Sequence, residues 1–255
     1  MGNTLPWLDV NCIIGSRSRP RSESNLSPDQ IHAALAEWGI GQALVRHSYA
    51  LEYDPVIGNR LCTEFCRANS WAIPCYAVVP HQTGDMPGGD ALLDYLAEGG
   101  ARAVTFHPAH GIDLRCAWSR ETCAVLEQAG VPVIVHDESV GLGDVDFLLS
   151  RHPNLHIISL RVNYAATRLI YPMLAIHPTF HIEFSRFPVH FGLEEITARF
   201  GADRLIFGTG LPEWDPAVTV GMVTHADLSE TDRTIIAGDG LRSLLWTPDR
   251  SEVKR

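Results

Sequence analysis

Four short apolar runs of this sequence are each followed by a histidine. These histidines are His47, His81, His107 and His136. An imidazole at the end of a buried strand can transfer protons near neutral pH or bind a zinc ion. Each could instead do no more than donate a hydrogen bond to a neighbouring loop. All four occur at the same place relative to an apolar run. For the set, we therefore weigh a chemical role equally with a structural one. His107 and His136 are the best candidates for general base catalysis.

Acidic side chains occur close to these runs. Glu183 lies inside an apolar run, where a carboxylate is costly unless a partner compensates it. Arg161 and Arg186 are candidate partners for it. Glu138 follows His136 after one residue, and it could orient that imidazole or cap the next helix.

Arginines are the candidate groups for holding an anion. Arg161 follows an apolar run and could grip a carboxylate or an oxyanion through two hydrogen bonds, or form a structural ion pair. Arg17 and Arg19 lie in the loop that follows the first apolar run, and this loop could close over an anionic substrate or remain a solvated loop. The further candidates for substrate binding are Asn11, His47, His81 and Arg186.

Lysine is nearly absent, since Lys254 is the only one in the chain. This excludes a carbamylated lysine that bridges two metal ions, a lysine that forms a Schiff base and a lysine in a phosphate-binding loop. The chemistry must therefore depend on histidine, arginine and carboxylate side chains.

Eight apolar, β-branched runs provide the strands that would position these residues. Their starts recur every 24–35 residues, approximately the length of one βα unit. The runs are Trp7–Ile13, Gln42–Arg46, Ile73–Val79, Ala103–Phe106, Pro132–Val135, His156–Leu160, His181–Phe184 and Leu205–Phe207. Continuous apolar runs are typical of parallel strands buried on both faces. The pattern predicts an α/β protein with a single (β/α)₈ TIM barrel over residues 1–255, whose working residues lie at the C-terminal ends of the strands.

Helix signals separate the runs. Ser27 can cap a helix that has Pro28 at its first position and Gln30 positioned to complete a capping box, and Gly39 ends the apolar stripe that follows. Similar patterns end at Gly130 and Gly201. A further helix is predicted to begin at Ser229 and run through Ile236.

The composition of the chain disfavours several classes of protein, including nucleic-acid-binding and membrane proteins. The chain has 255 residues, a net charge of −10 and six cysteines without a Cys-x-x-Cys pair. The negative charge disfavours nucleic acid and anionic membranes. Neither an apolar run of about 20 residues nor a secretory signal is present, so we expect a cytoplasmic protein with reduced thiols. Whether it forms a homo-oligomer is left open.

Two segments resemble the first and last strands of amidohydrolase-related proteins of the amidohydrolase 2 group. Leu8–Gly15 is similar to a strand with the pattern Asp-x-His-x-His-x-Gly, and Arg204–Pro212 is similar to a strand ending in Phe-Gly-Ser-Asp-x-Pro. Asn11 and Ile13 occupy the positions of the two histidines, and Gly210 occupies that of the metal-binding aspartate. The resemblance implies the barrel fold with a degenerate metal site.

The resemblance extends to the segments around His107 and His136 and to Ile235–Leu245. In this family the sixth strand usually ends in a histidine, where the chain has Arg161. Only His136 remains at a ligand position, and catalytic zinc normally has three protein ligands. We therefore expect no metal or other cofactor. If zinc does bind, His107 and His136 are the expected ligands.

Three functional hypotheses follow. Members of this family hydrolyse amides and lactones or decarboxylate aromatic acids, usually with one zinc ion. The first hypothesis is a metal-free hydrolase or lyase for a small carboxylated substrate. In it, Arg161 holds the anion, His107 or His136 is the general base, and Glu183 or Glu138 orients that base. The second is an inactive barrel that binds a ligand or partner, and the third is a zinc hydrolase with a new histidine set.

Overall fold

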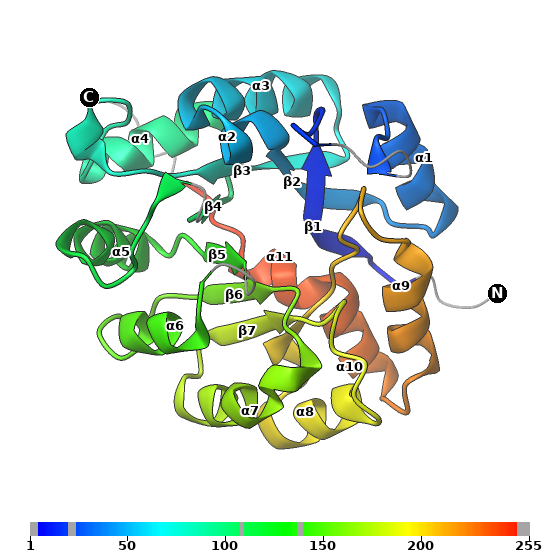
Figure 1. The fold of residues 1–255 in the computed structure, drawn as a ribbon. Coiled ribbons are helices and arrows are strands. Elements are labelled where there is room, and N and C mark those ends of the chain that lie inside the picture. Colours follow the sequence, from blue (N-terminus) through cyan, green and yellow to red (C-terminus); the bar gives the residue numbers. More distant parts are fainter. Residues whose placement is uncertain (1–4, 20–23, 108–109, 137–139, 249–255) are drawn as a thin grey trace.

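Eight parallel strands form one sheet in which each strand pairs with the next along the chain (Figure 1). The structure is a computed structural model, and it describes residues 5–19, 24–107, 110–136 and 140–248. The strands are β1 (Leu8–Ile14), β2 (Gln42–His47), β3 (Ala72–Ala77), β4 (Ala103–Thr105), β5 (Val133–His136), β6 (Ile157–Leu160), β7 (Phe180–Glu183) and β8 (Leu205–Ile206). Each predicted strand is confirmed to within two residues.

The segment that follows β8 closes the sheet against β1. The Val10 N–H donates to the Phe207 carbonyl over 3.1 Å, and the Ile13 N–H donates to the Leu211 carbonyl over 2.9 Å. These bonds return the sheet to its first strand. The predicted (β/α)₈ barrel is confirmed.

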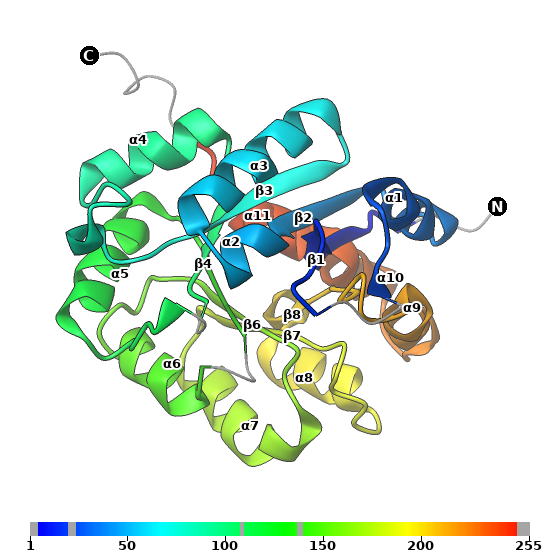
Figure 2. The same cartoon turned by 45° about the horizontal axis from the view of Figure 1, so that its top comes forward.

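Helices surround the strands, most of them in an outer ring, whereas α11 (Gly240–Leu244) lies near the centre of the molecule (Figures 1 and 2). They are α1 (Pro28–Glu37), α2 (Ser48–Glu52), α3 (Pro55–Ala68), α4 (Asp90–Gly99), α5 (Ala117–Ala129), α6 (Leu142–Leu149), α7 (Thr167–Ile176), α8 (Gly192–Phe200), α9 (Pro216–His225), α10 (Glu230–Thr234) and α11 (Gly240–Leu244). Short helical turns η2 (His81–Thr83), η4 (Tyr164–Ala166), η5 (Ala202–Arg204) and η6 (Ile235–Asp239) complete the set. Leu241 of α11 packs among the side chains of the barrel interior.

The start of α1 follows from local sequence. The Ser27 hydroxyl accepts a hydrogen bond from the Gln30 N–H, and the Gln30 side chain accepts one from the Ser27 N–H over 2.8 Å. This is the predicted capping box, and it satisfies two N–H groups that the first turn leaves without helical partners. Ile31 and Leu35 of the same helix are buried against the barrel.

Strand alternation decides which side chains enter the barrel. Successive side chains of a strand point to opposite faces, so residues two apart share a face. Leu44 and Ile134 belong to the apolar cluster inside the barrel. Arg46 and His136 follow them by two residues and therefore also face inward, at the C-terminal end. On β7, Ile182 packs in the cluster outside the barrel, so its neighbour Glu183 faces inward.

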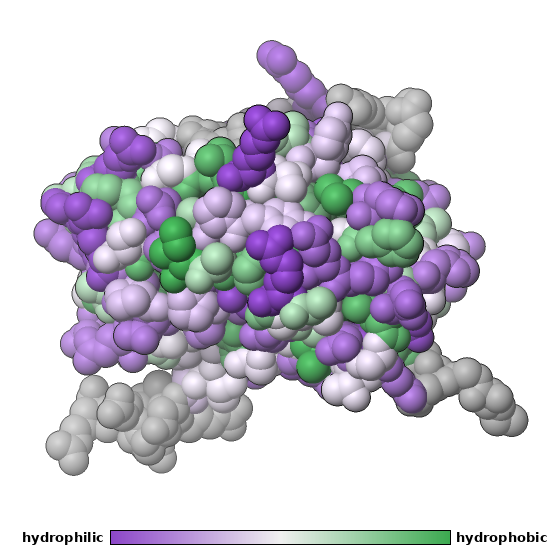
Figure 3. Space-filling view, turned by 90° about the horizontal axis from the view of Figure 1, so that it is seen from below, coloured by the Kyte–Doolittle hydropathy of each residue, from purple (hydrophilic) through white to green (hydrophobic). Residues whose placement is uncertain are grey.

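The surface seen in Figure 3 is a mosaic of hydrophilic and hydrophobic residues, with no continuous hydrophobic area on the part not covered by grey atoms. Within the described ranges, no helix combines the length and the apolar character that crossing a bilayer requires.

Candidate active site

A buried arginine and a buried glutamate are linked through one asparagine at the C-terminal end of the barrel. Arg46 on β2 donates through a terminal guanidinium nitrogen to the side-chain oxygen of Asn11 on β1. The Asn11 amide nitrogen donates in turn to Glu183 Oε2 over 3.1 Å. The exposed fractions of the three residues are 2%, 3% and 0%. These contacts fix the orientation of the Asn11 amide and place a cation and a carboxyl group at the two ends of one chain of hydrogen bonds.

Glu183 is enclosed by hydrogen-bond donors. Besides Asn11, its oxygens accept from the Arg161 N–H over 2.9 Å, from the Ser185 N–H over 2.5 Å and from the Ser185 hydroxyl over 3.0 Å. Burial raises the pKa of Glu183 to about 7, and the donors limit that rise because they favour the charged form. These hydrogen bonds fix the orientation of the Glu183 carboxyl group. With a pKa of about 7, the group is close to the midpoint of its titration at neutral pH.

Arg161 has an unusual backbone conformation and makes contacts through both its backbone and its side chain. Its φ of +56° lies in the left-handed region, which costs about 1–2 kcal/mol for a residue with a Cβ. Its backbone N–H donates to Glu183, while its guanidinium lies near Glu213 and over the Trp214 ring, 5.4 Å from the centroid. Strained residues persist where the surroundings fix them, and they concentrate at functional sites.

A second buried acidic side chain, Asp9, connects the first strand to the segment after the last strand. Asp9 accepts from the Asn11 N–H over 2.7 Å, from the Thr209 N–H over 2.9 Å and from the Thr209 hydroxyl over 2.5 Å. Burial raises the pKa of Asp9, and these three donors oppose that rise. Asp9 joins β1 to the segment after β8, which is a structural task.

His107 and His136 are held in their neutral forms. Burial, followed by the positive charge of Arg46, lowers the pKa of His136 to about 3. The same two causes lower the pKa of His107 to about 4. Because a neutral imidazole can accept a proton, both residues have the form that a general base requires at pH 7. The Nε atom of Arg46 has no hydrogen-bond partner within the described part of the chain.

His47 and His81 make contacts of a different kind from those of His107 and His136. His47 Nδ1 accepts from the Tyr49 N–H over 3.1 Å and thereby caps α2, and burial lowers the pKa of His47. His81 lies in η2, with its ring against Gly88, where an added Cβ would be 2.5 Å from the ring. Both contacts are of the kind that a structural histidine makes.

The rim of the barrel carries a network of opposite charges. Arg17 donates through Nε to Glu52 and through a terminal nitrogen to Glu213 Oε1 over 2.8 Å. Arg161 donates to the other oxygen of Glu213 over 3.1 Å. Arg186 lies 5.7 Å from the centroid of the Trp214 ring.

Arg19 is exposed on the loop after β1. Glu138 lies outside the described residues, so the predicted contact with His136 stays a prediction.

Three residues at the site were not predicted from the sequence. Arg46 stands in a predicted strand, and its charge within an apolar run is the same signal that identified Glu183. Glu52 and Glu213 lie in a short helix and a loop, and no motif marks either one.

Two positions at which the sequence resemblance places metal ligands make other contacts. Asn11, at the position of a metal-binding histidine, directs its oxygen to Arg46. Gly210, at the position of the aspartate, faces Trp214, since an added Cβ would be 2.9 Å from Trp214 Cδ1. Within the described ranges, no group of three or more histidine, cysteine or acidic residues is arranged to hold a metal ion. The expected absence of a cofactor and the zinc hypothesis are both left to direct measurement.

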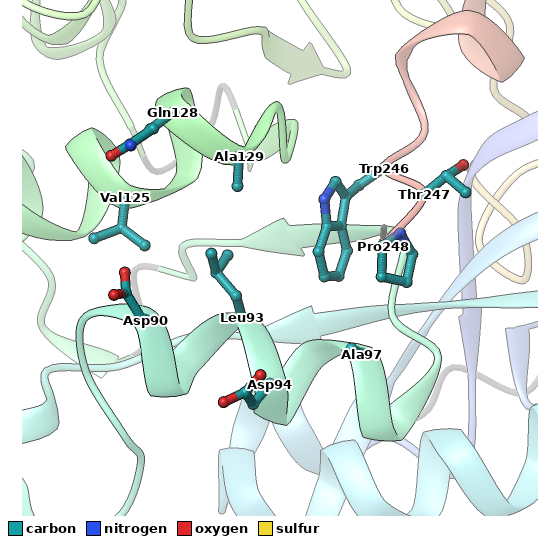
Figure 4. Close-up of a pocket in the computed structure, with 10 residues that line it drawn as sticks. All are labelled: Asp90, Leu93, Asp94, Ala97, Val125, Gln128, Ala129, Trp246, Thr247 and Pro248. Carbon is teal, nitrogen blue, oxygen red and sulfur yellow. The ribbon is translucent and has the colours of Figure 1, made fainter. Parts of the chain in front are cut away.

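A cavity of about 560 Å³ lies outside the barrel, between α4, α5 and the segment after α11 (Figure 4). Asp90, Asp94 and Trp246 are among its lining residues. None of the residues at the barrel mouth contributes to it, so it is separate from the site described above.

Several solved structures are similar in fold to this chain. A 2,6-dihydroxybenzoate decarboxylase from Rhizobium is 15% identical, with a TM-score of 0.71 over 93% of this chain and 97% of that chain. A dihydroxybenzoic acid decarboxylase from Polaromonas, solved with bound manganese and 2-nitroresorcinol, is 12% identical, with a TM-score of 0.70 over 94% and 96%. A 5-carboxyvanillate decarboxylase from Sphingomonas paucimobilis is 12% identical, with a TM-score of 0.64 over 95% and 100%.

At these identities the structural likeness shows the fold alone, and no curated protein matches the sequence. A family model described as Amidohydrolase matches residues 28–239. This match covers more than half of the sequence, and it agrees with the barrel and with the resemblance noted at both ends of the chain. The chain belongs to the amidohydrolase family.

Proposed function

We propose that this protein is an enzyme that hydrolyses a bond in a small carboxylated compound without a metal ion. The observation that carries the proposal is that Arg46 and His136 both face the barrel interior at its C-terminal end. There the positive charge of the Arg46 guanidinium, together with burial, lowers the pKa of His136 and of His107, so that both imidazoles are neutral at pH 7. A neutral imidazole can deprotonate water, and a buried cation can stabilise the negative charge that develops on an attacked carbonyl oxygen.

The proposed reaction assigns one role to each group. His136 takes a proton from water as the water oxygen attacks the carbonyl carbon of an ester, lactone or amide. Arg46 stabilises the resulting oxyanion, and its Nε–H is the donor without a partner within the described residues. The bond to the leaving oxygen or nitrogen then breaks, and the imidazolium returns its proton to that atom. Asn11 and Glu183 position Arg46.

The proposed substrate is anionic because cationic side chains gather at the entrance. Arg17, Arg161 and Arg186 lie at the rim, in a chain whose net charge is −10. The three decarboxylases named above act on carboxylated aromatic compounds, which supports the same substrate class for this chain.

Decarboxylation is the second candidate, favoured by the nature of those neighbours. It needs a proton donor for the carbon that loses CO₂. The imidazoles are poorly suited to this role at pH 7, since their pKa values of about 3 and 4 leave them unprotonated. The pKa of Glu183 is suitable, but donors surround both of its oxygens. Hydrolysis is therefore the better-supported reaction.

The test is turnover of a panel of carboxylated lactones, esters and amides in the presence of a chelator. We expect His136→Gln to lose roughly 100-fold or more in kcat/KM, the usual contribution of a general base. The matched control is His225→Gln, which changes an exposed histidine at the end of α9. Full turnover in His136→Gln, or turnover that requires added metal, would refute the mechanism. Binding without turnover would favour the inactive barrel.

A further inference from the structure

A carboxylate of the protein itself lies between two arginines at the barrel rim. Glu213 Oε1 accepts from Arg17 over 2.8 Å, and Glu213 Oε2 accepts from Arg161 over 3.1 Å. The two arginines come from the loops after β1 and β6, and Glu213 comes from the segment after β8. The site therefore accommodates a carboxylate with one arginine on each oxygen.

Both arginines are anchored by contacts that do not involve Glu213. Arg17 Nε donates to Glu52, whose second oxygen accepts from the Ser18 N–H over 2.6 Å. Arg161 is fixed by its left-handed backbone and by its N–H bond to buried Glu183, and its guanidinium lies over Trp214. The pair of guanidinium groups would thus keep its position if the carboxylate between them were exchanged.

Glu213 itself is held more loosely. It lies in the segment between β8 and α9, and its own backbone N–H donates to the Gly210 carbonyl over 3.0 Å. Its side chain is 32% exposed, compared with 28% for Arg17 and 13% for Arg161, so the contrast is greatest with Arg161. A side chain on an exposed connecting segment moves at lower cost than one whose backbone is tied to the barrel interior.

We propose that Arg17 and Arg161 form the subsite for the carboxylate of the substrate, and that Glu213 occupies this subsite until the substrate replaces it. The inference rests on the proposed function, because it names where the anionic group of that substrate binds. Exchange of one carboxylate for another preserves both ion pairs. A neutral compound would have to separate the pairs without replacing them, so the arrangement selects for anions.

Glu213→Gln tests the proposal, with benzoate as the anionic probe and benzamide as its neutral analogue. The variant removes the internal competitor and keeps the shape of the side chain. We expect benzoate to bind about threefold to tenfold more tightly to the variant than to the wild type, because less of the subsite is occupied. Isothermal titration calorimetry measures this ratio. Glu195→Gln is the matched control, since Glu195 is an exposed glutamate paired with Arg199 on α8.

Hydrogen exchange supplies an independent measurement on the wild-type protein. Saturating benzoate should increase exchange of the Glu213 amide, which donates to the Gly210 carbonyl, because Glu213 is displaced, and benzamide should not. Equal or weaker benzoate binding in Glu213→Gln, an equal response to benzamide, or no response to benzoate by either method would overturn the proposal.

These outcomes are distinguishable from failure of the proposed function. Neither measurement involves turnover. Benzoate binding without hydrolysis of any carboxylated compound would refute the reaction and leave the subsite intact. Hydrolysis of a carboxylated compound, without tighter benzoate binding in Glu213→Gln and without a hydrogen-exchange response to benzoate in the wild type, would refute the subsite and leave the reaction intact.

Discussion

Arg46 sets the charge of the site. It is almost completely buried, it faces the barrel interior, and its positive charge is the second cause, after burial, of the lowered pKa values of His107 and His136. A buried cation is costly unless it is compensated, and Asn11 connects it to the carboxyl group of Glu183. We propose that this fixed organic cation takes the place of the metal ion that the sequence resemblance implies.

We expect Arg46→Met to raise the pKa of both His107 and His136. The substitution removes a positive charge that disfavours the imidazolium forms, but burial remains, so both values should stay below the ordinary value of about 6.5. A pH titration of the histidine ring resonances by NMR measures the shifts. Arg199→Met, which alters an exposed arginine on α8, should leave both values unchanged. Equal histidine pKa values in Arg46→Met and the wild type would contradict this assignment.

Sequence reasoning found the residues of the site unevenly. Glu183 and His136 were recognisable because a polar side chain within or just after an apolar run is costly or functional. The same argument applies to Arg46, which also lies within an apolar run. Glu213 and Trp214 have no comparable sequence signal. Their positions depend on the backbone conformation at Gly210, where an added Cβ would contact Trp214.

The strands were predictable because each is buried on both faces and separated by capped helices. The C-terminal helix was only partly predictable. It begins at Ser229 as expected, but a π-helical turn, η6, interrupts it at Ile235–Asp239. Within that turn, a Cβ on Gly238 would be 2.0 Å from the Pro6 carbonyl oxygen. The distortion is thus associated with a close approach of the N-terminal segment, which no local sequence pattern encodes.

Gly208, in the segment after β8, packs closely against Glu183 of β7, so we expect Gly208→Ala to destabilise the protein. The added Cβ would be 2.5 Å from Glu183 Cγ and 3.1 Å from Asn11 Cβ, and the surrounding donors prevent Glu183 from moving freely. Overpacking of this kind costs about 1–3 kcal/mol in free energy of unfolding. Urea denaturation should show this loss for Gly208→Ala. Gly41→Ala, where an added Cβ meets nothing within 4 Å, should be nearly neutral. Equal stabilities of the two variants would mean that the Glu183 contact is not rigid.

Buried histidines couple the stability of the whole barrel to pH. His181 faces the interior near the start of β7, and its exposed fraction is 2%. His181 Nδ1 donates to the Asp203 carbonyl over 2.9 Å, so its Nε2 must accept from His156 Nδ1, 3.0 Å away. Burial lowers the pKa of His181 to about 3. The folded protein therefore keeps His181 neutral under conditions in which the unfolded chain binds a proton.

The sign of the effect on stability follows directly. The contribution of His181 is fully present above about pH 6.5, the unfolded pKa, and is lost as the pH falls towards about 3, because the unfolded chain binds the additional proton. We expect the free energy of unfolding of His181→Gln to fall less steeply between about pH 6 and 4 than that of the wild type. The difference should approach about 1.4 kcal/mol per pH unit. Urea denaturation at several pH values measures both slopes. A slope in His181→Gln equal to that of the wild type and of His225→Gln would show that His181 is not held neutral.

The measurement that tests the account most directly is the metal content of the protein purified without chelator, together with benzoate binding before and after chelator treatment. If a guanidinium group replaces the family's metal at the barrel mouth, elemental analysis should find far less than one equivalent of zinc or manganese per chain, and chelation should leave benzoate affinity unchanged. One tightly held metal ion per chain, with benzoate affinity lost on its removal, would contradict the account.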